Sequence, residues 1–215
     1  KGVNYVVDRL KKKKSSIFVG TSIGKNFDTS NEKAHLDYIL CLEKVYEFSD
    51  YIAINISSPN TEDLRDLSKQ EYLIFLLDKI KSKQEELSLE HGYKPIFLKV
   101  SPDEDLDNLK TICGAVIDIE LDGLICTNTS VNHEDPNGAG GLSGAPLKYK
   151  STEILNFIKK LVDHKVKLIA SGGVMSVADF QEKLDAGADL VQIYTGFIYE
   201  GPKLIQDINH HCSTK

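Results

Sequence analysis

Amide and hydroxyl side chains gather directly after the apolar run at residues 51–54, where they could bind a polar ligand. The run has the length and β-branched content of a buried strand. Pro59 then ends any β-ladder, because proline has no N–H to donate. The same residue types are common in turns, so the stretch taken alone also fits an Asn- and Ser-rich turn. The polar group consists of Asn55, Ser57, Ser58, Asn60 and Thr61.

A lysine stands inside a second apolar run, IFLKV at residues 96–100. Burying an ammonium group is costly unless an anion is its partner. Lys99 therefore indicates an anion-binding position at the end of this strand. The alternative is a lysine whose long side chain reaches from the strand end to solvent.

Two glycine-containing pairs, Gly172-Gly173 and Thr195-Gly196, follow two later apolar runs. Glycine lets the backbone approach a phosphate closely, and a following helix N-terminus adds partial positive charge. One Gly-Gly pair can be a simple turn, but two such sites after consecutive strands indicate phosphate binding.

Six strands that alternate with helices would position these residues. Strands are expected at residues 16–23, 51–54, 95–101, 123–129, 167–171 and 190–195. Helices are expected near residues 2–14, 31–48, 70–89, 106–117, 151–164, 177–186 and 203–211, with a Gly-rich loop at 132–146. Ser176 is the expected N-cap of the helix at 177–186, and Gly187 its C-cap residue.

The connections are too long for hairpins, so the strands should be parallel and covered by helices. An open doubly wound sheet would favour a GxGxxG motif after an early strand, which residues 20–24 (GTSIG) do not supply. The Gly-rich elements instead follow the last two strands, where barrels commonly bind phosphate. We therefore expect an α/β fold of the (β/α)₈ TIM-barrel type over residues 1–215, with about six of the eight units present.

Composition excludes several classes of protein. The formal net charge of −6 argues against a nucleic-acid partner, and Lys11 to Lys14 form a short basic run typical of a solvated helix end. Apolar stretches stay well below the ~20 residues that span a bilayer. The four cysteines and six histidines lack metal-ligand spacing, so no metal site is expected.

Six sequence blocks follow one another in the order and spacing of the dihydroorotate dehydrogenases. Across essentially its whole length the chain resembles the class 2, quinone-reducing branch, and within it the bacterial members. Ser58 marks this class, because class 1 enzymes place a cysteine at the matching position. The blocks are INISSPNT (54–61), FLKVSPD (97–103), DGLICTNT (122–129), GGLSGAPLK (140–148), IASGGVMS (169–176) and AGADLVQIYTGFIYEGP (186–202).

The resemblance implies an FMN-containing barrel oxidoreductase that oxidises dihydroorotate to orotate in pyrimidine biosynthesis and is reoxidised by a quinone. Ser58 would be the base that removes the C5 proton, with Thr61 and a water relaying it, while hydride passes from C6 to flavin N5. Lys99 would lie beside the flavin pyrimidine edge and stabilise negative charge there. Substrate-binding positions would be Asn55, Asn60, Asn128 and Thr129. Cofactor-binding positions would be Ser22, Asn55, Lys99, Thr127, Gly144, Gly173, Tyr194 and Thr195, the last three around the phosphate.

Three departures from the family pattern stand out. The N-terminal portion, which in relatives carries the membrane-contacting quinone entrance and the first two barrel strands, is absent from this sequence. We expect membrane contact through that portion alone, at the cytoplasmic side of the inner membrane. Ser22 stands where relatives usually have asparagine. Glu62-Asp63 replace a Pro-Gly pair, and we expect both carboxylates to point to solvent.

Two alternatives stay open at this point. In the first, the chain is a non-catalytic fragment or half of a two-chain assembly of the same barrel, as the missing strands and Ser22 would suggest. In the second, it is an FMN barrel with another substrate, such as a dihydrouridine synthase, although the net negative charge argues against an RNA substrate.

Overall fold

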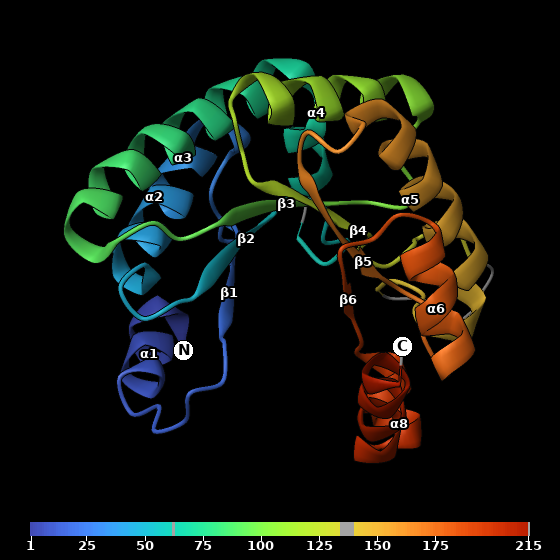
Figure 1. Ribbon diagram of the computed structural model, residues 1–215. Coiled ribbons are helices and arrows are strands. Elements are labelled where there is room, and N and C mark those ends of the chain that lie inside the picture. Colours follow the sequence, from blue (N-terminus) through green and yellow to red (C-terminus); the bar gives the residue numbers. More distant parts are fainter. Residues whose placement is uncertain (62, 134–139, 215) are drawn as a thin grey trace.

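The computed structural model describes residues 1–61, 63–133 and 140–214. Helices and strands alternate along most of this length (Figure 1). The strands are β1 (Gly20–Ile23), β2 (Tyr51–Asn55), β3 (Ile96–Val100), β4 (Gly123–Cys126), β5 (Lys167–Ser171) and β6 (Leu190–Gln192). The α-helices are α1 (Gly2–Leu10), α2 (Ala34–Val45), α3 (Gln70–His91), α4 (Leu106–Asp118), α5 (Lys148–Val162), α6 (Val177–Asp185), α7 (Thr195–Glu200) and α8 (Pro202–Ser213). Three 3₁₀ turns are η1 (Asn31–Lys33), η2 (Leu64–Ser68) and η3 (Ala145–Leu147).

The sheet is parallel throughout and keeps the strand order β1-β2-β3-β4-β5-β6. This sequential order is that of a barrel wall, whereas a doubly wound sheet reverses its strand order at a switch point. The sheet curls into an arch with β1 and β6 at its two ends, and the helices lie outside it (Figure 1). The expected parallel, barrel-type sheet is therefore confirmed as a six-stranded part of such a barrel.

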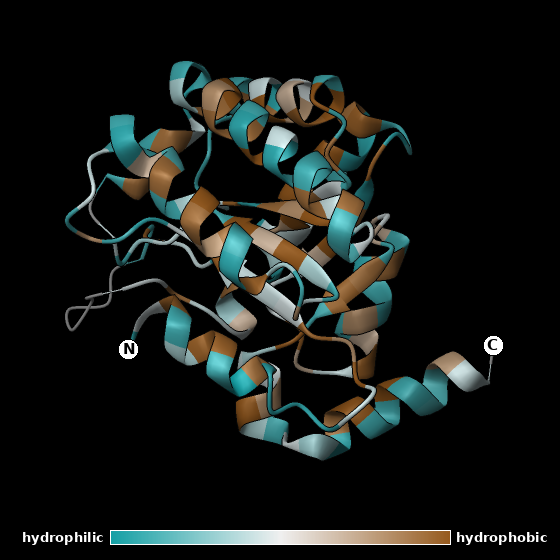
Figure 2. Ribbon diagram, turned by 90° about the vertical axis from the view of Figure 1, so that its left-hand side faces the viewer, coloured by the Kyte–Doolittle hydropathy of each residue, from teal (hydrophilic) through white to brown (hydrophobic). Residues whose placement is uncertain are grey.

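The two faces of the sheet bury different residues. Outward-facing side chains such as Ile54, Leu98 and Leu124 pack with the helices in the main core. Figure 2 shows the matching pattern, with apolar strands and helices that are apolar on one side. Inward-facing side chains form a smaller cluster of Ala53, Phe97, Ile125 and Ile169, with Tyr51 packed against it. Gln192 Nε2 of β6 donates to the Tyr51 hydroxyl of β2 at 3.3 Å, so side chains meet across the concave side.

Several predicted boundaries are wrong in informative ways. The first strand begins at Gly20 rather than at residue 16, because its partner β2 begins at Tyr51, opposite Gly20. Ile17 and Phe18 therefore extend beyond the ladder and are 70% and 82% exposed. The fourth strand ends at Cys126 rather than at Thr129, and the sixth ends at Gln192, with Thr195 starting α7. Helix α5 begins at Lys148, three residues earlier than expected.

Cap predictions on α6 are confirmed at its N-terminus. The Ser176 hydroxyl accepts a hydrogen bond from the Asp179 N–H, as an N-cap side chain does. The predicted loop at 132–146 is described only at 132–133 and 140–146, and it ends in η3.

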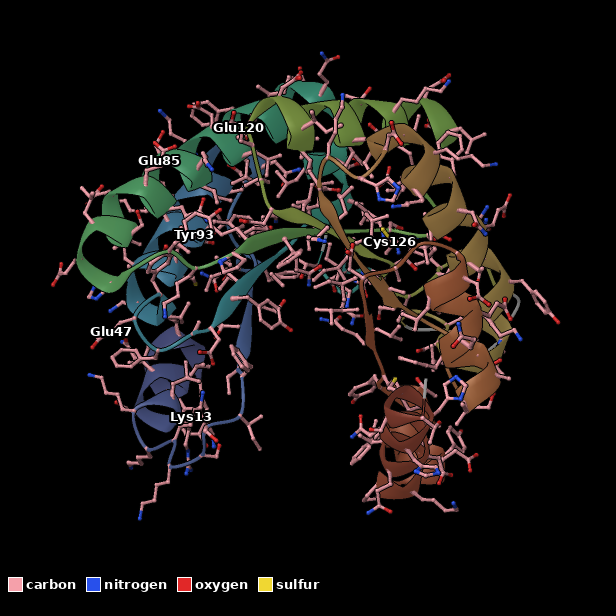
Figure 3. All side chains as sticks on the ribbon, viewed as in Figure 1. Lys13, Glu47, Glu85, Tyr93, Glu120 and Cys126 are labelled. Atoms are coloured by element: carbon pink, nitrogen blue, oxygen red, sulfur yellow. The ribbon has the colours of Figure 1, made fainter. Side chains whose placement is uncertain are left out.

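Charged side chains lie both on the outer helices and in the loops between elements. Glu85 and Glu120 point away from the concave side of the sheet (Figure 3). Within the described residues, no helix combines the length and the apolar character that crossing a bilayer requires. The same part of the chain holds no cluster of three metal-ligating side chains.

Candidate active site

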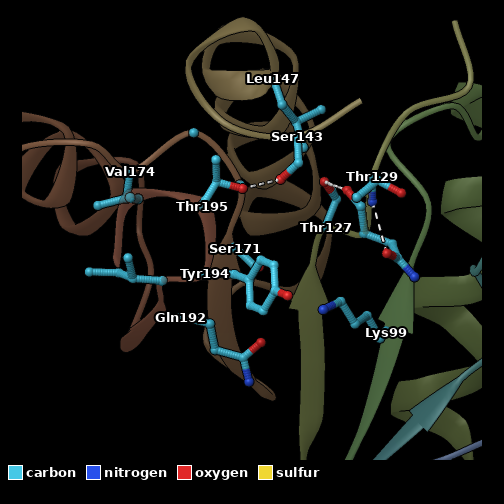
Figure 4. A pocket seen from close by; sticks show the side chains of 15 residues that line it. Lys99, Thr127, Thr129, Ser143, Leu147, Ser171, Val174, Gln192, Tyr194 and Thr195 are labelled. Carbon is cyan, nitrogen blue, oxygen red and sulfur yellow. Dashed lines mark hydrogen bonds between the residues drawn. The ribbon is translucent and has the colours of Figure 1, made fainter. Parts of the chain in front are cut away.

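A cavity of about 460 Å³ opens at the carboxyl ends of strands β3 to β6 (Figure 4). This is within the range of small-molecule sites, roughly 300–1,000 Å³. The carboxyl ends of parallel strands share one rim, which explains why residues far apart in sequence meet here. Seven predicted site residues line the cavity: Lys99, Thr127, Asn128, Thr129, Gly173, Tyr194 and Thr195.

Lys99 is the cation of this cavity. Its side chain is half-buried and points into the cavity (Figure 4). It has no hydrogen-bond or ion-pair partner among the residues that the structure describes. Burial alone lowers the pKa of Lys99 below its usual value. A desolvated ammonium without a counterion is a position prepared for an anionic group.

Glycine backbone forms the opposite wall. Gly172 and Gly173 have φ values of +108° and +76°, which L side chains rarely adopt. A Cβ on Gly173 would lie 2.3 Å from Lys148 Cα, and one on Gly196 would lie 2.1 Å from the Val174 carbonyl oxygen. The first N–H groups of α7 have no intrahelical acceptor, so they are available to a ligand. This close-packed, N–H-rich wall suits a phosphate group.

The loop after β4 closes over this wall. Ser143 and Thr195 share a hydrogen bond of 2.8 Å between their hydroxyl oxygens (Figure 4). A Cβ on Gly144 would lie 2.9 Å from Thr195 Cγ2. The predicted residue Gly144 therefore adjoins the cavity without lining it.

A partly buried hydrogen-bond network joins the ends of β2, β3 and β4. The Asn128 Nδ2 group donates to Asn55 Oδ1 and to Ser57 Oγ, both at 3.2 Å. Ser57 Oγ in turn donates to the Lys99 carbonyl oxygen at 2.7 Å. These bonds use the acceptor of Asn55 and leave its Nδ2 donor without an acceptor among the described residues. Asn55 can therefore donate to a ligand from a fixed orientation.

Three further predicted residues, Ser58, Asn60 and Thr61, lie on the loop after β2, beside this network. Ser58 is half-buried, and its hydroxyl accepts from the Asn60 N–H at 3.3 Å. The loop at residues 140–141 packs on it, since a Cβ on Gly140 would lie 3.5 Å from Asn60 Oδ1. Ser58, Asn60 and Thr61 are not among the residues lining the cavity.

Ser22 lies further away, on the edge strand β1, where it is exposed and opposite Ala53 in register. Of the two acidic residues after Thr61, Asp63 is exposed and Glu62 lies outside the described residues. Their predicted influence on ligand binding stays a prediction.

Sequence reasoning assigned no role to Arg65, which ties three loops of this rim together. Its guanidinium donates to the Ser57 carbonyl at 3.4 Å, to Asp103 Oδ2 at 2.9 Å and to the Thr129 carbonyl at 3.1 Å. Asp103 also accepts from the Val131 N–H at 2.8 Å. In the sequence, Arg65 stands out only as the last residue of the polar stretch. Its partners lie up to 64 residues away, so its role could not be inferred from its sequence neighbours.

Replacing Arg65 with methionine should lower the free energy of unfolding by about 2–4 kcal/mol, because Asp103 would lose its counterion while largely shielded from water. Urea denaturation measures this loss. The matched control is Lys69→Met, which removes an exposed lysine paired with Asp66 and should change little. Equal losses of unfolding free energy in the two variants would contradict this role of Arg65.

Ser143, Ser171 and Gln192 also line the cavity and were not predicted as site residues. Ser171 and Gln192 are the last residues of β5 and β6, where polar types end apolar runs. That signal was present in the sequence. Ser143 lies in the Gly-rich loop, and its position depends on its bond to Thr195.

Comparison with known proteins decides the family. The family model described as dihydroorotate dehydrogenase matches residues 1–214. The chain belongs to the dihydroorotate dehydrogenase family. It is 47% identical over 214 residues to the dihydroorotate dehydrogenase (quinone) of Vibrio vulnificus (strain YJ016), and 46% identical over 215 residues to that of Shewanella sediminis. These alignments cover 96% and 97% of this chain, and 64% and 63% of the relatives.

Solved structures of dihydroorotate dehydrogenase agree with this assignment. The Eimeria tenella enzyme in complex with ferulenol superposes with a TM-score of 0.88 at 32% sequence identity, over 96% of this chain and 62% of that one. Its ligand-free form gives a TM-score of 0.87. The dihydroorotate dehydrogenase family replaces the dihydrouridine synthase alternative, and the quinone-dependent relatives match the predicted class 2 resemblance. The chain spans slightly less than two thirds of the length of these relatives.

Proposed function

We propose that this protein oxidises dihydroorotate to orotate, with FMN as the hydride acceptor and a quinone as the final electron acceptor. The observation that carries the proposal is the cavity in which Lys99 without a partner faces a glycine-rich wall, in a chain of the dihydroorotate dehydrogenase family. The family is flavin-dependent in general. When bound, FMN would supply the hydride-accepting chemistry and pass two electrons to a quinone.

The residues present fit a flavin mononucleotide. Its phosphate suits the wall formed by Gly173, Thr195 and Gly196. At Gly173 and Gly196 any side chain larger than that of glycine would collide with backbone atoms. Lys99 would hold the flavin ring, and its cation would stabilise negative charge there. Thr127, Gly144 and Tyr194 complete the proposed contacts, and Tyr194 is 79% exposed. Ser22 would lie near the ring from β1.

The substrate would lie between the flavin and the loop after β2. Asn55 and Asn128, oriented by their mutual hydrogen bond, would bind the planar ring groups of orotate together with Asn60 and Thr129. Ser58 would take the C5 proton while the hydride leaves C6, which forms the C5=C6 double bond. No acidic group or histidine among the described residues hydrogen-bonds to the Ser58 hydroxyl. Thr61 and a water would therefore pass the proton to solvent.

A quinone acceptor dissolves in the membrane, so we infer that the protein works at a membrane surface, peripherally and on the cytoplasmic side of the inner membrane. The competing reading, a non-catalytic fragment or half of a two-chain assembly, has less support. The hydrogen-bond network at the ends of β2, β3 and β4 and the glycine wall proposed for the phosphate are both formed within the described residues.

The flavin content of the purified protein tests the proposal. We expect an oxidised-flavin absorption band, and mass spectrometry of the released cofactor should give the mass of FMN. A colourless protein that does not take up added FMN would overturn the proposed function. Release of FAD or riboflavin instead would contradict the assignment of the phosphate wall.

A further inference from the structure

Lys183 is a fully buried lysine to which the proposed function assigns no role. It lies on α6 with 0% exposure. Its Nζ donates to Thr152 Oγ1 at 2.6 Å, to Ser151 Oγ at 2.7 Å and to the Lys148 carbonyl oxygen at 3.2 Å. All three protons of the ammonium group are thereby used. The three acceptors belong to the first five residues of α5.

Stability alone does not explain a lysine at this position. Lysine is almost never fully buried unless it is paired. Desolvation lowers the pKa of Lys183 to about 8, while Glu182 and Asp179 act in the opposite direction and Lys148 adds to the lowering. Because the folded-state pKa lies below the unfolded value, burying the charged form costs stability below pH 8, and that cost is relieved as the pH rises toward 10.5. Apolar residues often replace buried ions without loss of stability.

The first turn of α5 supports the Gly172-Gly173 wall of the cavity. Ser151 Oγ, which accepts from Lys183, lies 3.0 Å from both the Gly172 and the Lys148 carbonyl oxygens and can donate its one proton to either. Gly173 packs directly on the Lys148 backbone, where a Cβ would leave only 2.3 Å to Lys148 Cα. A chain of contacts therefore runs from Lys183 through Ser151 to Gly172, and from Lys183 through the Lys148 backbone to Gly173.

A second tie crosses between the same two helices in the opposite direction. The Lys148 side chain of α5 bonds Asp179 at 2.9 Å and Glu182 at 3.1 Å on α6. Asp179 also accepts from the Met175 N–H at 3.0 Å, in the segment that joins the glycines to α6. The glycine wall is thus held between two lysines that cross between α5 and α6.

We propose that Lys183 is a positioning residue that, through Ser151, holds Gly172 and Gly173 in the conformation that receives the phosphate of the flavin nucleotide. This inference rests on the proposed function. Lys183 does not line the cavity, so it acts on the phosphate through the backbone and not by contact.

The test is the affinity of flavin-free protein for FMN and for riboflavin, which lacks the phosphate, measured by quenching of flavin fluorescence. In Lys183→Met, Lys183 no longer donates to the Lys148 carbonyl, so Ser151 can donate there instead of to Gly172, while Thr152 keeps its bond to the Lys148 carbonyl. Loss of a charged hydrogen-bond donor should weaken FMN binding about tenfold or more, while riboflavin affinity stays within about twofold. Lys150→Met is the matched control, because it removes an exposed lysine from the same helix α5, and it should change neither affinity.

Equal weakening of FMN and riboflavin would overturn the inference, since it would show a general loss of structure. Unchanged FMN affinity would overturn it as well. Ser151→Ala keeps the buried charge but cuts the link to Gly172, so it should show the same selective loss even if Lys183→Met does not fold. If the unsubstituted protein binds neither flavin, the proposed function itself fails. If it binds FMN and the variants show no selective loss, the inference about Lys183 alone fails.

Discussion

Replacing Ser58 with alanine is expected to slow flavin reduction by dihydroorotate about 10²- to 10⁴-fold, the usual contribution of a positioned proton acceptor. The flavin band should stay, because Ser58 does not line the cavity that we assign to the cofactor. The hydroxyl accepts one hydrogen bond, from the Asn60 N–H. Its removal should therefore disturb the loop little. Anaerobic stopped-flow absorbance measures the rate.

Ser58→Cys tests whether proton uptake at this position, and not the conformation of the loop, sets the rate. The thiolate form of a cysteine at this position can take up a proton, so this variant should keep more activity than Ser58→Ala. Ser88→Ala on the outer helix α3 is the control and should reduce at the normal rate. A normal rate in Ser58→Ala would remove Ser58 from the mechanism.

Replacing Lys99 with methionine should lower the same rate by about 10²- to 10³-fold, the cost of removing one preorganised electrostatic group. The flavin reduction potential should also fall, because the cation no longer stabilises negative charge on the reduced ring. Lys99 has no other partner among the described residues, so the charge is available for this purpose. Stopped-flow absorbance and a redox titration measure the two effects.

Lys167→Met is the control for Lys99. Lys167 lies at the opposite end of a strand, on β5, and pairs with Asp189. Since burial lowers the pKa of Lys99 and the neutral amine cannot stabilise the anion, the normal rate should fall at a pH below the usual lysine value. That alkaline decline should be absent in Lys99→Met. An unchanged rate and potential in Lys99→Met would contradict the electrostatic role.

Strand ends were the most predictable feature of this molecule. Hydrophobic periodicity and composition located each apolar run. Parallel strands bring their carboxyl ends to one rim regardless of the conformation of the loops. Lys99, Thr127, Asn128 and Thr195 could therefore be placed near one another before the structure was known. They do line one cavity.

Features that depend on partners distant in sequence were not predictable. Residues 16–19 have strand composition, yet the ladder starts only where β2 supplies a partner. Thr195 continues an apolar run but begins α7. Arg65 and Lys183 look like ordinary surface cations in the sequence. Their burial and their partners follow from the packing of loops and of α5 against α6.

The most direct measurement is anaerobic mixing of the flavin-loaded protein with dihydroorotate, followed by absorbance and by analysis of the product. We expect the oxidised-flavin band to bleach and one orotate to form for each flavin reduced. A protein that holds FMN but keeps its band unchanged, with no orotate formed, would show that this site does not oxidise dihydroorotate.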